Sequence, residues 1–345
     1  MKKKSTASLA VQRTALIVLC IVLGVILAVM IVGTVYAEHL LSRLNYVDPD
    51  GAPPVLSADE IAALENETDP VLQGFEAPEI EAADVDFGTG PQLQIGGGDI
   101  VNILLIGQDS DSETGARSDS MILCTFNKTK NTITMTSFLR DLYVKIPGYK
   151  NNRINAAYSF GGIPLLNETL QQNFGVEIDG NVQVDFSRFQ EIIDLLGGVT
   201  IELTKAEASF IRMHIPDSQV TEGSNLLNGA EALIYARDRD DVDGDFSRTN
   251  RQRKLLSVLI DEYKNKKLTD MLGLLNEILP MVTTDISKSD LTAYAVSLFP
   301  MLATAEIRTQ SIPVADGYYG ARIDGKAVLV PDMEKNIQAL VDSLT

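Results

Sequence analysis

The chain has 345 residues, a net charge of −18 and two cysteines, and these properties exclude several classes of protein. So negative a surface disfavours general binding to nucleic acid, because phosphate backbones select basic proteins. Cys20 lies in an apolar N-terminal run and Cys124 in a strand-like segment, so no disulfide joins them and the fold must depend on its hydrophobic core. His39 and His214 lie in unrelated contexts and indicate neither a zinc site nor a histidine-based triad.

The N-terminal segment has the pattern of a membrane anchor. Residues 1–13 carry basic side chains, and residues 14–37 contain no charged side chain. At ~1.5 Å per residue, a helix over this run reaches roughly 36 Å, enough to cross a hydrocarbon core of ~30 Å. The basic cluster before the run and the acidic stretch after it place residues 1–13 in the cytoplasm. We therefore expect a single-pass protein of the cell membrane whose remaining residues are extracellular.

A cleaved secretory signal is the alternative interpretation of the same run, because Val35-Tyr36-Ala37 resembles a small-residue cleavage site. The apolar region of such a signal has typically ~7–15 residues, which is much shorter than this run, and the difference favours the anchor. Both interpretations export the rest of the chain.

Residues 38–98 have the composition of an extended spacer. They contain many carboxylates and several prolines, have Arg43 as their single Lys or Arg, and end in Gly96-Gly97-Gly98. Such a segment buries little apolar surface and repels itself, so we expect it to be largely extended. One short helix is expected from Ser57, because Ser57 and Glu60 have the spacing of a capping box.

From residue 99 onward, apolar runs alternate with amphipathic segments, which is typical of an α/β domain. We expect strands at 101–107, 120–126, 132–138, 182–186 and 199–203. We expect helices near 163–173, 187–196, 229–237, 247–265, 268–280 and 288–302, the third of them capped by Asn228. Residues 99–345 should therefore form a single αβα-type catalytic domain with a central mixed β-sheet, preceded by one N-terminal transmembrane helix.

The first two expected strands carry carboxylates at their adjoining ends. Asp109 follows the first strand just past Gln108, which is where open α/β sheets bind ligands. A polar loop containing Arg117 then leads to Asp119 at the start of the next strand. If the two ends meet, Asp109 and Asp119 flank one mouth and can hold a hard cation such as magnesium, Mg²⁺. Taken singly, each aspartate also fits a loop residue that caps a turn.

The strand expected at 132–138 leads to Arg140 and Asp141, a second charged pair at a strand end. The planar guanidinium can bind phosphate oxygens through two donors at once, so Arg140 indicates an anion site. The alternative is a surface ion pair between Arg140 and Asp141, which would contribute little to stability.

The densest concentration of arginine lies between residues 235 and 253, where lysine is absent. Arg237 and Arg239 open this concentration. Arg248, Arg251 and Gln252 have the spacing i, i+3, i+4 of one side of the helix expected at 247–265, so they can converge on one ligand. Arg248 also lies in the first turn of that helix, where the dipole favours a phosphate. The alternative is a charged surface loop whose arginines balance its own aspartates.

Several segments in fixed order resemble the LytR-CpsA-Psr family of cell-envelope phosphotransferases. The resemblance covers roughly residues 100–345, and its segments are NILLIGQDS, ARSDSMILCTFN, MTSFLRDLYVKIPG, RINAAYSFGG, VDFSRFQEIIDLLGGV, LNGAEALIYARDR and DGDFSRTNRQRKLL. Several such motifs in one order are far more specific than any single motif. Gln108 and the pair Phe138-Leu139 depart from the family pattern, but neither departure removes a charged group.

The resemblance implies transfer of a phosphoglycan, such as teichoic acid or a capsular polymer, from a polyprenyl pyrophosphate carrier to peptidoglycan, with formation of a phosphodiester. It implies Mg²⁺ as the cofactor, held by Asp109 and Asp119, which with Arg140 would be catalytic. The pyrophosphate-binding set that it implies is Arg140, Arg237, Arg239, Arg248 and Gln252, with Arg117 and Arg153 in the same motif segments. The acceptor hydroxyl needs a positioned base, for which an aspartate of the site is the candidate.

Other functions remain open from the sequence. A pyrophosphatase would use water in place of the sugar hydroxyl at the same site, and the sequence does not separate it from a transferase. A non-catalytic envelope regulatory or binding protein is disfavoured, because only residues 1–13 precede the span to contact DNA and tryptophan, the usual stacking platform for sugars, is absent. The apolar segments 271–282 and 291–303 fit either a groove for the lipid carrier or ordinary core helices.

Overall fold

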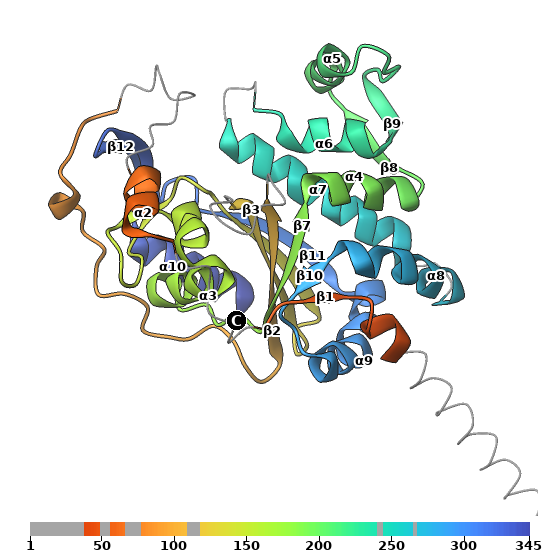
Figure 1. Cartoon of the computed structure of the whole chain (residues 1–345), viewed down its shortest axis with the longest axis horizontal. Helices are drawn as coiled ribbons and strands as arrows, with labels where there is room; N and C mark the ends of the chain where they lie inside the picture. The colour runs from red at the N-terminus through yellow and green to blue at the C-terminus, as the bar shows by residue number, and fades with distance from the viewer. Residues whose placement is uncertain (1–37, 49–55, 66–76, 109–117, 240–243, 265–267) are drawn as a thin grey trace, which may run out of the picture. The chain divides into compact units, whose positions relative to one another are not determined.

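The computed structural model describes residues 38–48, 56–65, 77–108, 118–239, 244–264 and 268–345 (Figure 1). The chain divides into two compact units, Met1–Leu44 and Asn45–Thr345. The expected cytoplasmic tail (1–13) and membrane span (14–37) lie outside the described residues. Within the described ranges, no helix is both long enough and apolar enough to cross a membrane.

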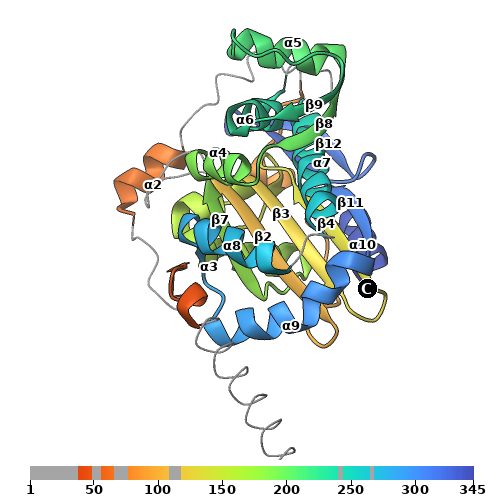
Figure 2. The same ribbon diagram turned by 90° about the vertical axis from the view of Figure 1, so that its right-hand side faces the viewer.

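A seven-stranded mixed sheet forms the centre of the second unit (Figure 2). In spatial order its strands are β1 (Asn45–Tyr46), β10 (Thr283–Thr284), β7 (Gly180–Asp185), β2 (Ile100–Gln108), β3 (Ser118–Asn127), β4 (Thr132–Phe138) and β11 (Glu306–Ile312). β3 is antiparallel to β2 and β4, whereas β7 is parallel to β2 and β11 is parallel to β4. The carboxyl ends of β2, β4, β7 and β11 therefore meet the start of β3 at one edge.

The remaining elements are helices and short hairpins. The helices are α2 (Ala58–Glu65), α3 (Ile154–Phe174), α4 (Phe186–Leu195), α5 (Lys205–His214), α6 (Gly229–Arg237), α7 (Asp245–Tyr263), α8 (Leu268–Ile278), α9 (Lys288–Thr304) and α10 (Met333–Leu344), with the 3-10 turns η2 (Ala82–Asp84) and η3 (Leu279–Met281). The hairpins are β5 (Tyr143–Val144) with β6 (Asn152–Arg153), β8 (Val199–Leu203) with β9 (Gly223–Leu227), and β12 (Tyr318–Ile323) with β13 (Lys326–Pro331).

Helices cover both faces of the sheet, as the alternation of side chains along its central strands requires (Figure 1). Leu104 and Leu123 belong to the main core, which includes buried residues of α3 and α10. On the opposite face Ile103 packs in a cluster with Leu298 of α9, and Ile122 packs in another cluster with Leu256 of α7. The expected αβα arrangement around a mixed sheet is confirmed.

Each predicted strand is a strand and each predicted helix is a helix, but one predicted strand lies outside the central sheet. β4 and β8 have the predicted bounds, and β2, β3 and β7 differ by up to two residues. The strand at 199–203 lies outside the central sheet, because β8 pairs with β9 and packs with α4, α5 and α6 over a separate apolar cluster. α3 begins at Ile154, well before the expected 163, with a kink at Gly161 and Gly162 where the backbone is not helical.

The prediction that residues 38–98 form an extended spacer is wrong for the C-terminal part of this segment. Val85, Phe87 and Ile95 are buried in the main core, and the backbone of Ile95 bonds to that of Gly175. Composition pointed to an extended segment because carboxylates surround these apolar residues, yet a few apolar side chains can anchor a segment to a core built by others. The expected capping box is confirmed at Ser57, where Oγ accepts from Glu60 N and the Glu60 carboxylate accepts from Ser57 N.

Candidate active site

The edge where the strand ends meet carries a β-bulge at Asp119. Gly107 pairs with Ser120 and Gln108 pairs with Ser118, so Asp119 is the extra residue on β3. A bulge of this kind bends the strand and redirects a side chain, and bulges occur often beside active sites. The carboxylate expected at the mouth of the sheet is therefore presented by an irregularity in strand pairing.

Arg140 lies just beyond β4 and is surrounded by three carboxylates. Its Nη1 donates to Asp119 Oδ1 at 3.0 Å, and its Nε lies 3.6 Å from Asp141 Oδ2 and 3.8 Å from Asp245 Oδ2. Burial opposes the charged guanidinium, but attraction by Asp141, Asp245 and Asp119 outweighs it and raises the pKa of Arg140 above its ordinary value. With side-chain exposures of 14% and 16%, Arg140 and Asp141 do not form a surface pair.

Asp245 begins α7 and joins three arginines. Its Oδ2 accepts from Arg248 Nη2 at 3.0 Å, and its Oδ1 lies 3.4 Å from Arg239 Nε. Burial raises the pKa of Asp245 to about 6, although the nearby Arg140 guanidinium favours the charged form. A carboxyl group that titrates close to neutral pH in a cluster of charges is suited to proton exchange.

Sequence reasoning did not single out Asp245 as a site residue. The available signal was its position in the first turn of α7, three residues before Arg248 on the same helix side. What the sequence could not give was the approach of Arg140 and Arg239 to the same carboxylate.

Arg248 is nearly enclosed by protein. Its side chain is 2% exposed, and its Nη2 donates both to Asp245 and, at 3.0 Å, to the backbone oxygen of Asp119. Within the described part of the chain its Nε has no hydrogen-bond partner. Arg248 therefore fixes α7 to the bulge of β3, a positioning role in addition to its expected contact with an anion.

Arg239 and Arg237 differ in their surroundings. Arg239 is 30% exposed and lies against Asp245, and burial together with repulsion by Arg140 lowers its pKa below the ordinary value. An anionic ligand would relieve that repulsion. Arg237 is exposed, and the described contact of its guanidinium is with the ring of Phe186, 4.7 Å from the ring centroid. The structure therefore brings Arg239 into the charged cluster and leaves Arg237 beside it.

The helix side formed by Arg248, Arg251 and Gln252 does not converge on one ligand. Arg251 Nε donates to Glu207 Oε1 at 2.9 Å and its Nη1 donates to the backbone oxygen of Asp238 at 2.8 Å, so these donors serve the protein. Gln252 accepts from Ser120 Oγ at 2.9 Å and donates to the backbone oxygen of Ala236 at 3.3 Å. Arg251 and Gln252 hold α5, α6 and β3 to α7.

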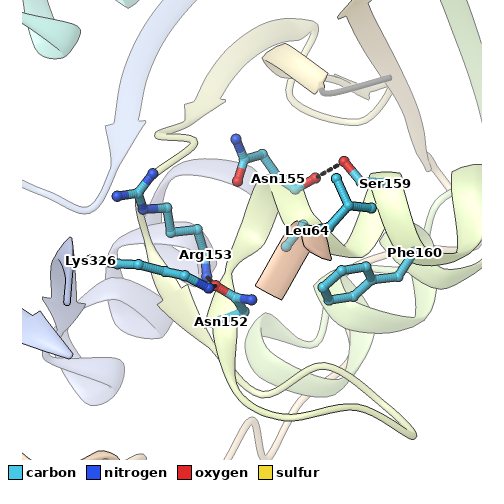
Figure 3. A pocket seen from close by; sticks show the side chains of 8 residues that line it. Leu64, Asn152, Arg153, Asn155, Ser159, Phe160 and Lys326 are labelled. Carbon is cyan, nitrogen blue, oxygen red and sulfur yellow. Dashed lines mark hydrogen bonds between the residues drawn. The ribbon is translucent and has the colours of Figure 1, made fainter. Parts of the chain in front are cut away.

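Arg153 connects the cluster to a small pocket at the start of α3 (Figure 3). Its Nε lies 3.5 Å from Asp141 Oδ1 and donates to the backbone oxygen of Ala327 at 3.1 Å. The pocket has a volume of about 30 Å³ and is lined by Leu64, Asn152, Arg153, Asn155, Ala156, Ser159, Phe160 and Lys326. A cavity of this size holds a few water molecules at most, so it does not accommodate a glycan.

Two expected site residues, Asp109 and Arg117, lie outside the described residues. Among the residues that are described, no group of three or more His, Cys, Asp or Glu side chains is arranged to hold a metal ion. Asp119 nevertheless supplies the hard carboxylate oxygen that Mg²⁺ prefers, at the strand end next to Gln108, the residue preceding Asp109. Asp119 is therefore a described residue whose chemistry fits the metal, and its expected partner Asp109 lies outside the described residues.

Comparison with known proteins finds relatives that match more than half of the chain. The chain is 32% identical over 252 residues to "Regulatory protein MsrR" of Staphylococcus aureus (strain COL), covering 71% of this chain and 74% of that protein. It is 30% identical over 217 residues to "Polyisoprenyl-teichoic acid--peptidoglycan teichoic acid transferase TagT" of Bacillus subtilis (strain 168), covering 60% of this chain and 66% of that protein.

A solved structure has the same fold with a ligand bound. It is the "LytR-CPS2A-psr family protein YwtF (TagT) with bound octaprenyl pyrophosphate lipid", which matches with a TM-score of 0.57 and 26% identity over 75% of this chain and 96% of that chain. The family model described as LytR_cpsA_psr matches residues 79–342, which is most of the sequence. The chain belongs to the LytR-CpsA-Psr family.

Proposed function

We propose that this protein transfers a phosphoglycan from a polyprenyl pyrophosphate carrier to a sugar hydroxyl of peptidoglycan, forming a phosphodiester and releasing polyprenyl phosphate. One observation carries the proposal: Arg140, Arg239 and Arg248 converge on Asp245 at the strand edge where Asp119 is presented. The names of the TagT relative and of its lipid-bound structure support both the reaction and the carrier.

The arginines account for recognition of the pyrophosphate. A pyrophosphate carries several negative oxygens, and charge develops on the leaving phosphate during transfer. Arg239, which is partly exposed and repelled by Arg140, gains most when an anion arrives. Arg140 is held permanently charged by its three carboxylates and would stabilise the developing charge from a fixed position.

Asp119 is the proposed holder of Mg²⁺, together with Asp109, which lies ten positions earlier in the sequence. Asp119 Oδ1 is bonded to Arg140, and within the described part of the chain Oδ2 makes no hydrogen bond. When bound, the cation would neutralise part of the charge on the pyrophosphate oxygens. The Arg140 guanidinium, together with a cation held by the adjacent Asp119 carboxylate, would then bind the phosphate from two sides and orient it for attack by the acceptor hydroxyl.

Asp245 is the proposed general base for the acceptor hydroxyl. Its pKa of about 6 leaves it mostly ionised at neutral pH, while keeping it more basic than an ordinary aspartate. Arg248 and Arg239 hold its two oxygens in place, so its direction is fixed before the acceptor arrives. The proton of the acceptor hydroxyl would pass to this carboxylate as the new oxygen–phosphorus bond forms.

We also propose that residues 14–37 anchor the protein in the cell membrane and that the catalytic domain is extracellular. The uncharged run and the basic residues before it support this topology. A lipid-linked donor and a peptidoglycan acceptor both lie at that membrane face. The apolar segments in α8 and α9 remain the candidates for contact with the lipid carrier.

The test uses the purified full chain with magnesium, a synthetic polyprenyl pyrophosphate glycan and peptidoglycan fragments. Mass analysis should show fragments that have gained the glycan together with one phosphate, and release of polyprenyl phosphate. Free glycan phosphate without any modified fragment would instead identify a pyrophosphatase. An unchanged donor would remove both enzymatic interpretations.

A further inference from the structure

A cluster of three uncharged polar side chains lies next to the charged site and takes no part in it. Tyr158 Oη lies 3.2 Å from Gln108 Oε1 and 2.8 Å from Gln183 Oε1. The three side chains come from α3, β2 and β7, so segments far apart in the sequence converge on one phenol.

The cluster occupies the edge of the sheet where ligands are expected. β2 and β7 are neighbouring parallel strands, Gln108 ends β2, and Gln183 lies two residues before the end of β7. In open α/β sheets, ligands bind outside the carboxyl ends of such strands. Gln108 also pairs with Ser118, the residue before Asp119, so the cluster and the charged site share the same strand ends.

Tyr158 is joined to the charged site through α3 as well. It lies about one helical turn beyond Arg153 and Ile154, where α3 begins. Arg153 contacts Asp141, and the backbone of Asn155 donates to the carbonyl oxygen of Arg140. The first turn of α3 therefore holds the phenol at a set position relative to Arg140.

The hydrogen-bond capacity of the cluster exceeds what the protein satisfies. A phenol has one proton, so Tyr158 donates it mainly to Gln183 Oε1 at 2.8 Å, and Gln108 Oε1 at 3.2 Å shares the same proton. Both glutamines then retain their amide NH₂ donors, and the phenol oxygen retains its capacity to accept. Within the described residues, neither the Gln108 side chain nor the Gln183 side chain makes a further hydrogen bond.

The unused groups lie in a partly buried setting that a ligand or water can still reach, because none of them is among the fully buried side-chain atoms without a partner in the described residues. Gln108 is 8% exposed, and Tyr158 and Gln183 are half-buried. Polar groups in such positions normally have partners, from the protein, from water or from a ligand. Burial also raises the pKa of Tyr158 to about 12, so the phenol keeps its proton at neutral pH and the pattern of donors does not change.

We propose that Gln108, Tyr158 and Gln183 form a subsite that recognises a hydroxyl-bearing sugar of the glycan substrates. A sugar hydroxyl both donates and accepts, which matches amide NH₂ donors beside a phenol oxygen that can accept. The proposal rests on the proposed function, because it assigns this sugar either to the glycan attached to the pyrophosphate or to the peptidoglycan acceptor. Tyr158, Gln108 and Gln183 would select the sugar while the arginines bind the pyrophosphate.

The experiment compares Tyr158→Phe and Gln183→Met with the wild-type full chain in detergent. Tyr149→Phe is the matched control, because Tyr149 also packs against the main core, stacks on Phe160 and lies outside the subsite. Three quantities are measured: the Kd for octaprenyl pyrophosphate, the Kd for octaprenyl pyrophosphate linked to a disaccharide, and the KM for peptidoglycan fragments. Thermal melting checks that each variant is folded.

A lost hydrogen bond between neutral groups should weaken sugar binding about threefold to tenfold. A loss confined to the disaccharide-linked donor supports the subsite and assigns it to the donor, and a rise confined to the acceptor KM supports it and assigns it to the acceptor. Equal losses for the sugar-free lipid, or no change in any of the three quantities, would overturn it. If the wild type binds the donor selectively yet transfers nothing, the proposed function fails while the binding comparison still decides the subsite.

Discussion

Arg140 Nη1 donates to Asp119 Oδ1 at 3.0 Å, and this ion pair joins the end of β4 to the bulge at the start of β3. The two side chains are 21 residues apart in the sequence and meet because β3 and β4 are antiparallel neighbours. Both expected roles, binding of a metal by Asp119 and binding of an anion by Arg140, depend on this contact.

Replacement of Arg140 by Lys should impair turnover strongly. Lysine keeps the charge but lacks the planar fork that reaches Asp119, Asp141 and Asp245 together. We expect kcat to fall on the order of a hundredfold, as for loss of one preorganised donor to developing charge. Steady-state kinetics would measure the change, and Arg188→Lys is the control because Arg188 lies in an exposed pair with Glu191. Wild-type kcat in Arg140→Lys would show that only a point charge is needed.

Replacement of Asp119 by Asn should weaken the dependence on magnesium. The amide keeps the shape of the carboxylate but loses the negative oxygen that a hard cation prefers. A titration of rate against Mg²⁺ should require a higher concentration for half-maximal activity and reach a lower maximum. Asp217→Asn is the control, because Asp217 is exposed on the segment between α5 and β9. Identical titrations for Asp119→Asn and the wild type would remove Asp119 from the metal site.

Titration of Asp245 should appear in the pH dependence of both rate and stability. As a base it must be ionised, so kcat should fall as the pH drops through about 6. Because the folded pKa is raised, the folded state binds this proton more tightly than the unfolded state, and stability from this group is lost as pH rises from about 4 to about 6. Asp245→Asn cannot titrate, so its stability relative to wild type should improve between pH 4 and pH 7.

Two measurements check the Asp245 prediction. Between pH 5 and pH 8, kcat of Asp245→Asn should be low throughout and should no longer fall as the pH drops through about 6. Denaturant unfolding at pH 4 and pH 7 gives the relative stability. An unaltered acidic limb in Asp245→Asn would assign the base to another group.

Arg251 should matter for stability more than for chemistry. Its side chain and that of Glu207 are 9% and 12% exposed, so removal of the guanidinium leaves a buried carboxylate uncompensated. Arg251→Leu is expected to lower the free energy of unfolding by about 3–5 kcal/mol, whereas Arg188→Ala, in an exposed pair, should change it by less than about 1 kcal/mol. Denaturant unfolding measures both, and similar values for the two variants would contradict the buried network.

The membrane topology can be tested independently of activity. A reporter that works only outside the cytoplasm, fused after Thr345, should be active, and a reporter that needs the cytoplasm should be inactive there. Insertion of basic residues after the run at 14–37 would be the matched perturbation, because it reduces the charge asymmetry. Activity of the cytoplasmic reporter in the unmodified chain would overturn the export prediction.

The sequence predicted most of the elements that build the sheet, because burial leaves a local pattern. β2, β3 and β4 have runs of apolar residues, and the capping box at Asn228 marks the start of α6. β11 went unpredicted because it is an edge strand with mostly polar side chains, whereas α5 and α10 went unpredicted although each has a capping residue and an apolar face.

The sequence by itself determined which charged residues are available and in what order, including Asp119, Arg140, Arg239 and Arg248. Tertiary structure alone decided which of them share a site. It moved Arg251 into a structural network, left Arg237 against Phe186, and added Asp245 to the cluster. The reason is physical: contacts such as Arg248 to Asp119, 129 residues apart, depend on strand register and helix packing, which no short stretch of sequence encodes.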